Sequence, residues 1–358
     1  MSSKATFLSI LSMCLILLLA SGCGGSADDT TDADAGDNLM EDPDEDAAVD
    51  MESDPDAAPD IIPDPAPDTS PDPDDDPVDD GGGEPELPGR CPVVGDLGPG
   101  DHEFELTHDG ITHNCLLHVP AVYDNSVETP LVLNMHGLVL NARNQEGFSN
   151  MNPVADARGF IVAYPDGYQS SWNAGGCCGQ ASSENIDDVG YLKAVVAHLT
   201  ERLCIDQRRV YATGLSNGGH MSNRLGCEAG DVFAAIAPVA GAVHVPDCSP
   251  ARPIPVIIYH GKDDWIVFYS EGRSAFEEWI GINGCTGEPV RTEYGGSYCE
   301  AYEACAAGVK TTMCTLDPMG HCWPGGSQSH CLFAFGSYND DIIASEHMVD
   351  FFMEFTLP

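Results

Sequence analysis

The chain has 358 residues, with 58 acidic against 14 basic side chains and a formal net charge of −44. The first 90 residues hold 25 acidic and 2 basic residues, which leaves 33 acidic and 12 basic residues, net −21, in the other 268. An acidic surface repels nucleic acid and anionic lipid headgroups, so we expect neither as a partner. The 268 residues are enough for one large domain with its own core.

The chain begins with an export signal. Residues 5–20 form an apolar run behind Lys4 that is short for a membrane span and bounded by small residues. The run ends in ASGC, which resembles the lipobox of bacterial lipoproteins and implies a signal peptide over 1–22 and lipidation of Cys23. Ala20 stands where that pattern prefers leucine, so an ordinary cleaved signal is the alternative. The protein is therefore expected at the outer membrane or cell surface through a lipid anchor, or otherwise secreted.

Residues 23–90 are rich in aspartate and proline and almost free of aromatic side chains. Such a segment cannot bury enough apolar surface to offset the entropy lost on ordering, and like charges keep it extended. We interpret it as a disordered acidic tether rather than an interaction tail or a calcium-binding repeat. Residues 91–358 then form the folded domain.

Short apolar runs alternate with amphipathic stretches in this domain. The runs are rich in valine and isoleucine and closed by glycine or proline, which predicts buried strands at 116–120, 130–137, 160–167, 209–214, 234–241, 255–261 and 310–316. Helical spacing predicts helices over 185–204, from 217, and over 344–355, the last capped by Ser345. This order predicts an α/β fold, a mainly parallel central sheet with helices on both faces and chemistry at the carboxyl ends of the strands.

One serine lies at such a strand end. Residues 214–218 read GLSNG between a predicted strand and a predicted helix, which matches the G-x-S-x-G nucleophile elbow of the α/β-hydrolase fold. The flanking glycines leave room for a strained turn that exposes Ser216. The motif is weak by itself, and its position after a buried strand strengthens it.

A serine nucleophile needs a base and an orienting carboxylate, which follow it in the order acid, then histidine in this fold. Asp263 and Asp264 follow the strand at 255–261, and His321 follows the strand at 310–316. These side chains belong at the same sheet edge as Ser216. His136, His220 and His260 are competing histidines, which we interpret as shaping turns or the pocket floor.

Several blocks together resemble a secreted esterase family: PLVLNMHG, YPDG…SWNAGGCCG, DDVGYL, CIDQRRVYATGLSNGGHMSNRLGCE, FAAIAPVAG, PVIIYHGKDD and GHCWPGG. The family contains feruloyl esterases, acetylxylan esterases and polyhydroxybutyrate depolymerases, and the similarity covers about residues 100 to 356. It implies Ser216 as nucleophile, His321 as general base and Asp264 as acid, with Asp263 as the adjacent alternative.

Two backbone amides are candidates for the oxyanion hole. The N–H of Asn217 opens the helix after the serine, and a second N–H is expected from Leu138, after the first long strand. The sequence HGLVLNARN departs from the family there and makes the turn more apolar. Trp172, Asn173, Trp323 and His136 are the candidate substrate contacts, although a tryptophan more often fills core volume.

The domain has 13 of the 15 cysteines, which in an exported protein predicts disulfides and one unpaired thiol. Two His and two Cys within HCWPGGSQSHC could suggest a metal site, but export favours a Cys322–Cys331 disulfide. Two further hypotheses pair Cys204 with Cys248, and connect Cys177 and Cys178 with Cys227.

These observations predict an exported serine carboxylesterase that uses no cofactor or metal and acts, as a monomer, on feruloyl or acetyl esters of plant polysaccharide. A polyhydroxybutyrate (oligomer) depolymerase is the second hypothesis. A surface lipoprotein that binds carbohydrate or a partner without turnover is the alternative from another class.

Overall fold

The computed structural model describes residue 91 and residues 96–329, 331 and 335–358. The predicted signal peptide, Cys23 and the tether lie outside the described residues. All the described residues belong to one compact unit. None of its helices is long and apolar enough to cross a membrane.

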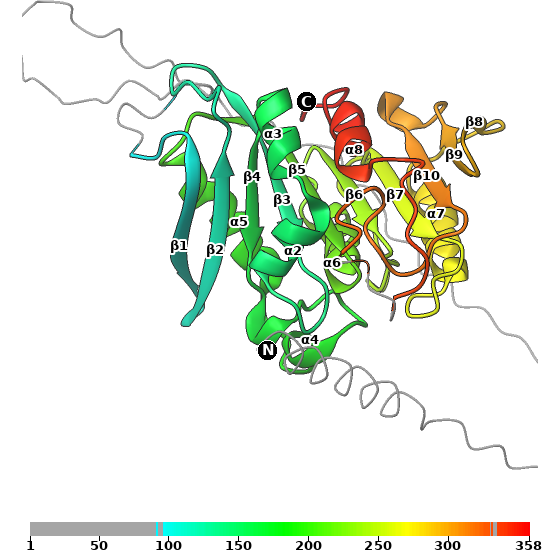
Figure 1. Cartoon of the computed structure of the whole chain (residues 1–358), viewed down its shortest axis with the longest axis horizontal. Helices are drawn as coiled ribbons and strands as arrows, with labels where there is room; N and C mark the ends of the chain where they lie inside the picture. Colours follow the sequence, from blue (N-terminus) through cyan, green and yellow to red (C-terminus); the bar gives the residue numbers. More distant parts are fainter. Residues whose placement is uncertain (1–90, 92–95, 330, 332–334) are drawn as a thin grey trace, which may run out of the picture. The chain divides into compact units, whose positions relative to one another are not determined.

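A ten-stranded sheet runs through the domain in the order β1-β2-β4-β3-β5-β6-β7-β10-β9-β8 (Figure 1). Its strands are β1 Gly100–His108, β2 Ile111–Val119, β3 Thr129–Met135, β4 Ile161–Pro165, β5 Ile205–Leu215, β6 Ala235–Val239, β7 Val256–Gly261, β8 Val290–Tyr294, β9 Ser297–Tyr302 and β10 Thr311–Leu316. The six strands from β4 to β10 in this order pair in parallel. The two strands at each edge pair antiparallel.

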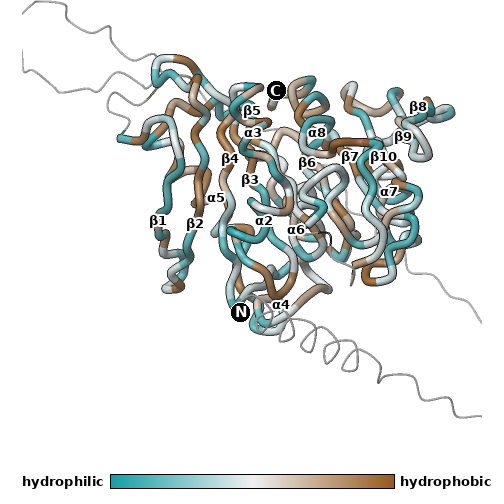
Figure 2. The backbone as a smooth tube through the Cα atoms, viewed as in Figure 1, coloured by the Kyte–Doolittle hydropathy of each residue, from teal (hydrophilic) through white to brown (hydrophobic). Residues whose placement is uncertain are grey.

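Helices cover both faces of the sheet, as predicted. They are α2 Ala142–Ser149, α3 Asn152–Arg158, α4 Gly179–Ser183, α5 Asp188–Thr200, α6 Asn217–Glu228, α7 Tyr269–Ile282 and α8 Ala344–Phe352, with 3-10 turns at Tyr168–Ser170 and Ala306–Gly308. Apolar side chains of α5, α6 and α7 form one core layer with one face of the strands, and those of α2, α3 and α8 form the second layer with the other face. Figure 2 shows hydrophobic residues along β4 and β7, as expected of strands buried on both faces.

All seven predicted strands are present, but three edge strands were missed. β1 alternates exposed with partly buried residues, and β8 is almost wholly exposed, so neither carries the continuous apolar run that reveals a buried strand. The predicted cap of the last helix is wrong. Ile343 is the N-cap of α8, and the hydroxyl of Ser345 instead donates to the carbonyl oxygen of Ser149 at 2.7 Å.

The turn from β5 into α6 depends on two glycines. A Cβ atom at Gly214 would lie 2.6 Å from the carbonyl oxygen of Met135, at the end of β3. A Cβ atom at Gly218 would overlap that same oxygen. Because this oxygen belongs to the backbone of a buried strand, it cannot move aside without disturbing the sheet. The elbow is therefore packed directly against β3.

We predict that Gly218→Ala lowers the free energy of unfolding by about 3 kcal/mol or more, because overpacking against a fixed backbone costs at least as much as overpacking a core. Gly281→Ala, near the end of α7, is the matched control: nothing lies within 4 Å of its Cβ position. There, alanine should be neutral or stabilise by about 0.5–1 kcal/mol. Urea unfolding of both variants checks this, and equal midpoints would contradict the packing account.

Candidate active site

Ser216 stands alone between β5, which ends at Leu215, and α6, which begins at Asn217. Its backbone has φ 58° and ψ −119°, a conformation that residues other than glycine rarely adopt. Two hydrogen bonds hold the turn: its N–H donates to the carbonyl oxygen of Val239 at 2.9 Å, and its carbonyl accepts from the N–H of His220 at 2.8 Å. The serine is partly exposed at the carboxyl edge of the sheet, as the elbow motif predicts.

Asp264 and His321 meet at the same edge. β7 and β10 end in register, Gly261 opposite Leu316, and each side chain lies on the loop that follows its strand. His321 Nδ1 lies 2.7 Å from Asp264 Oδ2, and the two residues are only 6% and 4% exposed. Asp263 is exposed and its carboxylate makes no such contact among the described residues, so the geometry supports Asp264 rather than Asp263 as the candidate acid.

Two backbone N–H groups and two histidines surround the carboxylate of Asp264. Its Oδ1 accepts hydrogen bonds from the backbone N–H groups of Ile266 and Val267, at 2.9 Å and 3.1 Å. Its Oδ2, besides contacting His321, lies 3.6 Å from Nε2 of the buried His260. Burial by itself would raise the pKa of Asp264, but the hydrogen bond to His321, the charges of both histidines and the Ile266 N–H together lower it. The carboxylate is therefore kept ionised.

His220, one turn after Ser216 in α6, is a buried histidine beside the site. Burial, followed by the charge of His244, lowers the pKa of His220 to about 3. The Ser216 hydroxyl has no hydrogen-bond partner among the described residues, so its link to His321 Nε2 remains a prediction.

The two candidate oxyanion donors have free amides. Asn217 is the first residue of α6, where N–H groups lack partners within the helix, and neither its N–H nor that of Leu138 donates to another described residue. Leu138 lies between Gly137, which packs against Ser216, and Val139, whose N–H donates to the carbonyl oxygen of Ser170 at 2.8 Å. The Leu138 loop is thus fixed beside the serine. The positive end of the α6 dipole also stabilises a negative charge bound there.

Trp172 and His136 lie beneath the site rather than on its surface. Both are 0% exposed. The indole N–H of Trp172 donates to the carbonyl oxygen of His136 at 3.0 Å, and His136 Nε2 accepts from the N–H of Gly167 at 2.9 Å. Because both side chains are buried, the structure gives no support to the predicted substrate contacts of either residue. They connect the loop after β3 to the loop after β4.

Asn173 and Trp323 are also buried, at 3% exposure each. The amide of Asn173 donates to the carbonyl oxygen of Ile186 at 2.9 Å, and the indole N–H of Trp323 donates to the hydroxyl of Ser345 at 3.0 Å. Trp323 belongs to the core layer under α8. The structure thus gives no support to the predicted substrate contact of either residue, and the general expectation that tryptophan fills core volume applies.

Asn217 fastens the loop after β4 to the elbow. Its Oδ1 accepts from the N–H of Trp172 at 2.7 Å, and its Nδ2 donates to the carbonyl oxygen of Trp172 at 3.0 Å. The next residue of the loop, Asn173, donates its N–H to Oδ2 of Asp188 at 2.6 Å. No motif in the sequence predicts that these amide and carboxylate groups position the loop.

Six disulfides join twelve of the described cysteines: Cys91–Cys204, Cys177–Cys178, Cys227–Cys248, Cys285–Cys305, Cys299–Cys314 and Cys322–Cys331. The predicted Cys322–Cys331 bond and the single unpaired thiol, Cys115, are confirmed. Disulfides in this number are typical of exported proteins.

The other two cysteine hypotheses are wrong. Cys204, at the amino end of β5, pairs with Cys91, and Cys248 pairs with Cys227, just before the end of α6. Cys248 lies in the long loop between β6 and β7 rather than at a strand start, so it is not beside Cys204. Cys177 and Cys178 pair with each other.

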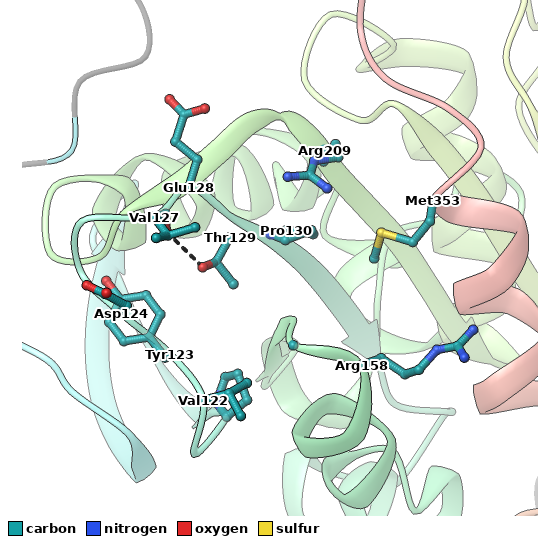
Figure 3. Close-up of a pocket in the computed structure, with 12 residues that line it drawn as sticks. Val122, Tyr123, Asp124, Val127, Glu128, Thr129, Pro130, Arg158, Arg209 and Met353 are labelled. Carbon is teal, nitrogen blue, oxygen red and sulfur yellow. Dashed lines mark hydrogen bonds between the residues drawn. The ribbon is translucent and has the colours of Figure 1, made fainter.

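A separate pocket of about 450 Å³ lies at the amino end of β3, away from the carboxyl ends where the candidate site lies (Figure 3). Thr129 and Pro130, the first residues of β3, line it together with Arg158 and Arg209. Both guanidinium groups are already paired with carboxylates, those of Asp350 and Asp206. None of the candidate site residues lines this pocket, so it has no part in the chemistry considered above.

A mostly parallel sheet with a nucleophile elbow, and with an acid and a histidine at the ends of later strands, defines an α/β-hydrolase. Residues 116–271 match the protein family described as Esterase PHB depolymerase. The match confirms the resemblance to an esterase family that the sequence blocks predicted.

Three known proteins illustrate the relationship. The chain is 37% identical to feruloyl esterase B of Piromyces equi over 226 residues, 56% of this chain and 41% of that protein. It is 29% identical to the putative esterase NocK of Nocardia uniformis subsp. tsuyamanensis over 254 residues, 63% of this chain and 74% of that protein. The structure of an acetyl xylan esterase from Aspergillus awamori superposes with a TM-score of 0.50 at 15% identity, covering 62% of this chain and 94% of that one. At this identity the structural likeness shows the fold alone, and the chain spans less than half of the Piromyces relative.

Asp188 is a second buried carboxylate near the site, with the opposite pKa shift. It is 0% exposed, and its Oδ1 has no hydrogen-bond partner in the described part of the chain. Burial raises its pKa from 3.8 to about 6, although the N–H of Asn173 and the charge of Arg224 oppose the shift. The folded state therefore holds a proton that the unfolded state has lost between about pH 4 and pH 6.

We predict that Asp188 contributes stability below pH 4 that is lost as the pH rises to about 6. Asp188→Asn should therefore gain stability relative to the wild type across this window, by about 2–3 kcal/mol at most. Asp187→Asn is the control: this exposed neighbour accepts from the N–H of Gly190, its pKa is lowered, and the variant should not gain stability as the pH rises. Urea unfolding at pH 4, 5, 6 and 7 measures both variants, and a constant difference for Asp188→Asn would contradict the assignment.

Proposed function

We propose that the protein is an exported serine carboxylesterase that works through an acyl-enzyme. The observation that carries the proposal is the buried hydrogen bond between His321 Nδ1 and Asp264 Oδ2, 2.7 Å long, at the sheet edge where Ser216 occupies a strained elbow. A carboxylate on Nδ1 fixes the tautomer of the imidazole, so that Nε2 keeps its lone pair. That nitrogen can then accept the proton of the serine hydroxyl.

In the first half of the reaction, Ser216 Oγ forms a bond to the ester carbonyl carbon while its proton passes to His321 Nε2. The carbonyl oxygen becomes an anion that accepts hydrogen bonds from the N–H groups of Asn217 and Leu138. As the carbonyl re-forms, the bond to the alcohol oxygen breaks and His321 donates its proton to the leaving alcohol. Water then attacks the acyl-enzyme, again through His321, and releases the acid and the free serine.

Asp264 stabilises the imidazolium that forms in both halves. Its lowered pKa keeps it ionised at any pH where His321 can act as a base. The two N–H groups of Ile266 and Val267 hold the other carboxylate oxygen, so Asp264 orients His321 without itself taking up the proton.

For the substrate we propose feruloyl or acetyl esters of plant polysaccharide. The relatives support this class, since they include feruloyl esterase B of Piromyces equi and a bifunctional acetylxylan esterase/xylanase of Neocallimastix patriciarum, which is 27% identical over 157 residues. The family description supports a second candidate, an oligomer of hydroxybutyrate. Both candidates are carboxylic esters, so the same residues serve either one.

We predict that the purified protein releases ferulate from methyl ferulate or acetate from acetylated xylan faster than it releases hydroxybutyrate from hydroxybutyrate trimer. Ser216→Ala should lower kcat at least about a thousandfold and abolish labelling by a fluorophosphonate, because no nucleophile remains. Asp264→Asn should lower kcat by up to about 10⁴, since an amide at that position favours the wrong tautomer of His321.

Asp263→Asn is the matched control for the acid, because Asp263 is adjacent in sequence but exposed. Its kcat should stay within about twofold of the wild type, as expected for a surface substitution away from the chemistry. Loss of activity in Asp263→Asn but not in Asp264→Asn would overturn the assignment. A wild-type protein that neither hydrolyses these esters nor reacts with the fluorophosphonate would instead favour a non-catalytic, carbohydrate- or partner-binding surface lipoprotein.

We also propose that Cys23 carries a lipid that anchors the protein to a membrane of the cell envelope. The six disulfides support export, and the ASGC sequence supports the anchor. Cys23→Ser should move the protein from the membrane fraction to the soluble extracytoplasmic fraction. Cys14→Ser, in the apolar run of the leader, is the control and should leave the distribution unchanged. Equal distributions of the wild type and Cys23→Ser would contradict the anchor.

A further inference from the structure

The disulfide between adjacent residues Cys177 and Cys178 does little for stability by joining distant segments. A disulfide stabilises mainly by closing a loop in the unfolded chain, and its effect grows with the length of that loop. The other five bonds span 9 to 113 residues, whereas this one spans a single residue. Both cysteines are partly exposed. Loop closure therefore does not account for this bond, and its position in the fold is the relevant feature.

On one side, the disulfide is fixed to the elbow through the loop that carries it. The N–H of Cys178 donates to the carbonyl oxygen of Trp172 at 3.3 Å, and the N–H of Ala174 donates to the carbonyl oxygen of Cys177 at 2.7 Å. The carbonyl oxygen of Trp172 also accepts from the side chain of Asn217, the residue after Ser216. A short chain of hydrogen bonds thus connects the backbone of Cys178 to Asn217, the candidate oxyanion donor.

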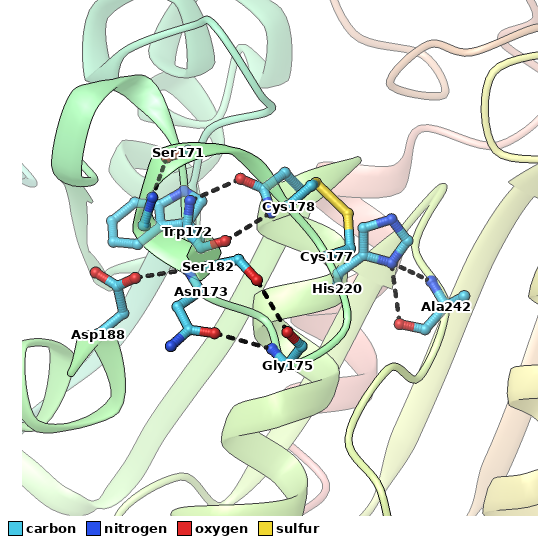
Figure 4. The surroundings of a disulfide bond; sticks show 12 residues. Ser171, Trp172, Asn173, Gly175, Cys177, Cys178, Ser182, Asp188, His220 and Ala242 are labelled. Atoms are coloured by element: carbon cyan, nitrogen blue, oxygen red, sulfur yellow. Dashed lines mark hydrogen bonds between the residues drawn. A yellow bond between two sulfur atoms is a disulfide. The ribbon is translucent and has the colours of Figure 1, made fainter. Parts of the chain in front are cut away.

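On the other side, the disulfide lies near two histidines, His220 and His244, the first of which Figure 4 shows beside Cys177. Sγ of Cys177 and one ring nitrogen each of His220 and His244 lie within 4.8 Å of one another, and the two rings are 4.5 Å apart. The N–H of Gly176 donates to the carbonyl oxygen of His244 at 2.9 Å, which holds the loop before β7 against the disulfide. Because Cys177 Sγ is bonded to Cys178, it is not a thiolate and does not form a metal site with the histidines.

Burial lowers the pKa of both histidines, which favours their neutral form. Nδ1 of the buried His220 lies 2.7 Å from the backbone nitrogen and 3.0 Å from the carbonyl oxygen of Ala242, which fixes this ring behind His244 and the disulfide. The partly exposed ring of His244 and the polarisable disulfide make a surface suited to another planar ring, because sulfur favours contact with an aromatic edge.

This surface adjoins the candidate active site. The backbone N–H of His220, one turn along α6, donates to the carbonyl oxygen of Ser216 at 2.8 Å. His244 and both cysteines are partly exposed, as Ser216 is. A substrate bonded to the serine therefore has this surface within reach.

We propose that the Cys177–Cys178 disulfide and His244 form the wall of a subsite that binds the phenolic ring of an aromatic ester. The inference rests on the proposed esterase function and names its substrate class. The disulfide supplies the apolar edge against the ring, and His244 supplies a hydrogen-bonding nitrogen for its phenolic or methoxy oxygen. A ring bound equally in the ground and transition states lowers KM, so loss of the wall should raise KM.

The test compares three esters: methyl ferulate, with a ring in the acyl group; phenyl acetate, with a ring in the alcohol; and methyl acetate, with no ring. In C177A/C178A, kcat/KM for at least one ring-bearing ester should fall about three- to tenfold, the range expected for sulfur–aromatic contacts, mainly through KM. For methyl acetate it should stay within about twofold. His244→Ala, which keeps the disulfide, should show the same pattern.

C285A/C305A is the matched control. It removes a disulfide that joins the loop after α7 to the loop after β9, outside the candidate site, and should leave kcat/KM for all three esters unchanged. An equal fall on all three esters in C177A/C178A would overturn the subsite, since the disulfide would then only support the loop that holds Asn217. No change on any ester would overturn it too. Failure of the proposed function is distinct: the wild type would then hydrolyse none of the three esters.

Discussion

The site depends on the close approach of the β5–α6 turn to the end of β3, which is possible only because residues 214 and 218 lack side chains. Ser216 cannot relax out of its positive φ without pulling the first turn of α6 away from the backbone of Met135. The rest of the fold opposes that movement, since β5 and β3 are central strands with helices packed on both faces. A strained residue persists because its surroundings determine its backbone completely.

Around the elbow, buried polar side chains hold loops in place, and two of them, His136 and Asn173, are residues that the sequence predicted as substrate contacts. His136, Asn173 and Asn217 use their ring nitrogens and amides to bind backbone groups of the loops after β3 and β4. Trp172 lies between them as core volume with one satisfied N–H. Each of these buried polar groups makes a hydrogen bond to a loop and so avoids the cost of an unpaired polar atom. The loops in turn carry the amide of Leu138 and the Cys177–Cys178 disulfide.

Asp264 and Asp188 show that burial alone does not decide the charge of a carboxylate. Both are almost inaccessible to solvent. Two backbone N–H groups and two histidines surround Asp264, and their combined effect exceeds the cost of desolvation, so its pKa falls. Asp188 keeps one oxygen without a partner, and its pKa rises to about 6. The difference lies in the number of donors that each carboxylate meets.

The sequence alone determined the order and type of the central elements, because these depend on local pattern. It also proposed Ser216, His321 and one of two adjacent carboxylates for the chemistry. Continuous apolar runs reveal strands that are buried on both faces, and Ser216, Asp264 and His321 follow such strands in a fixed order. The exposed edge strands β1 and β8 leave no comparable pattern, and their existence was missed. Only the tertiary structure showed that Asp264 and not Asp263 contacts His321, showed which tryptophans are buried, and paired the cysteines other than Cys322 and Cys331. These outcomes depend on which side chains from distant segments face each other across a loop or a core layer, and that geometry exists only once the chain has folded.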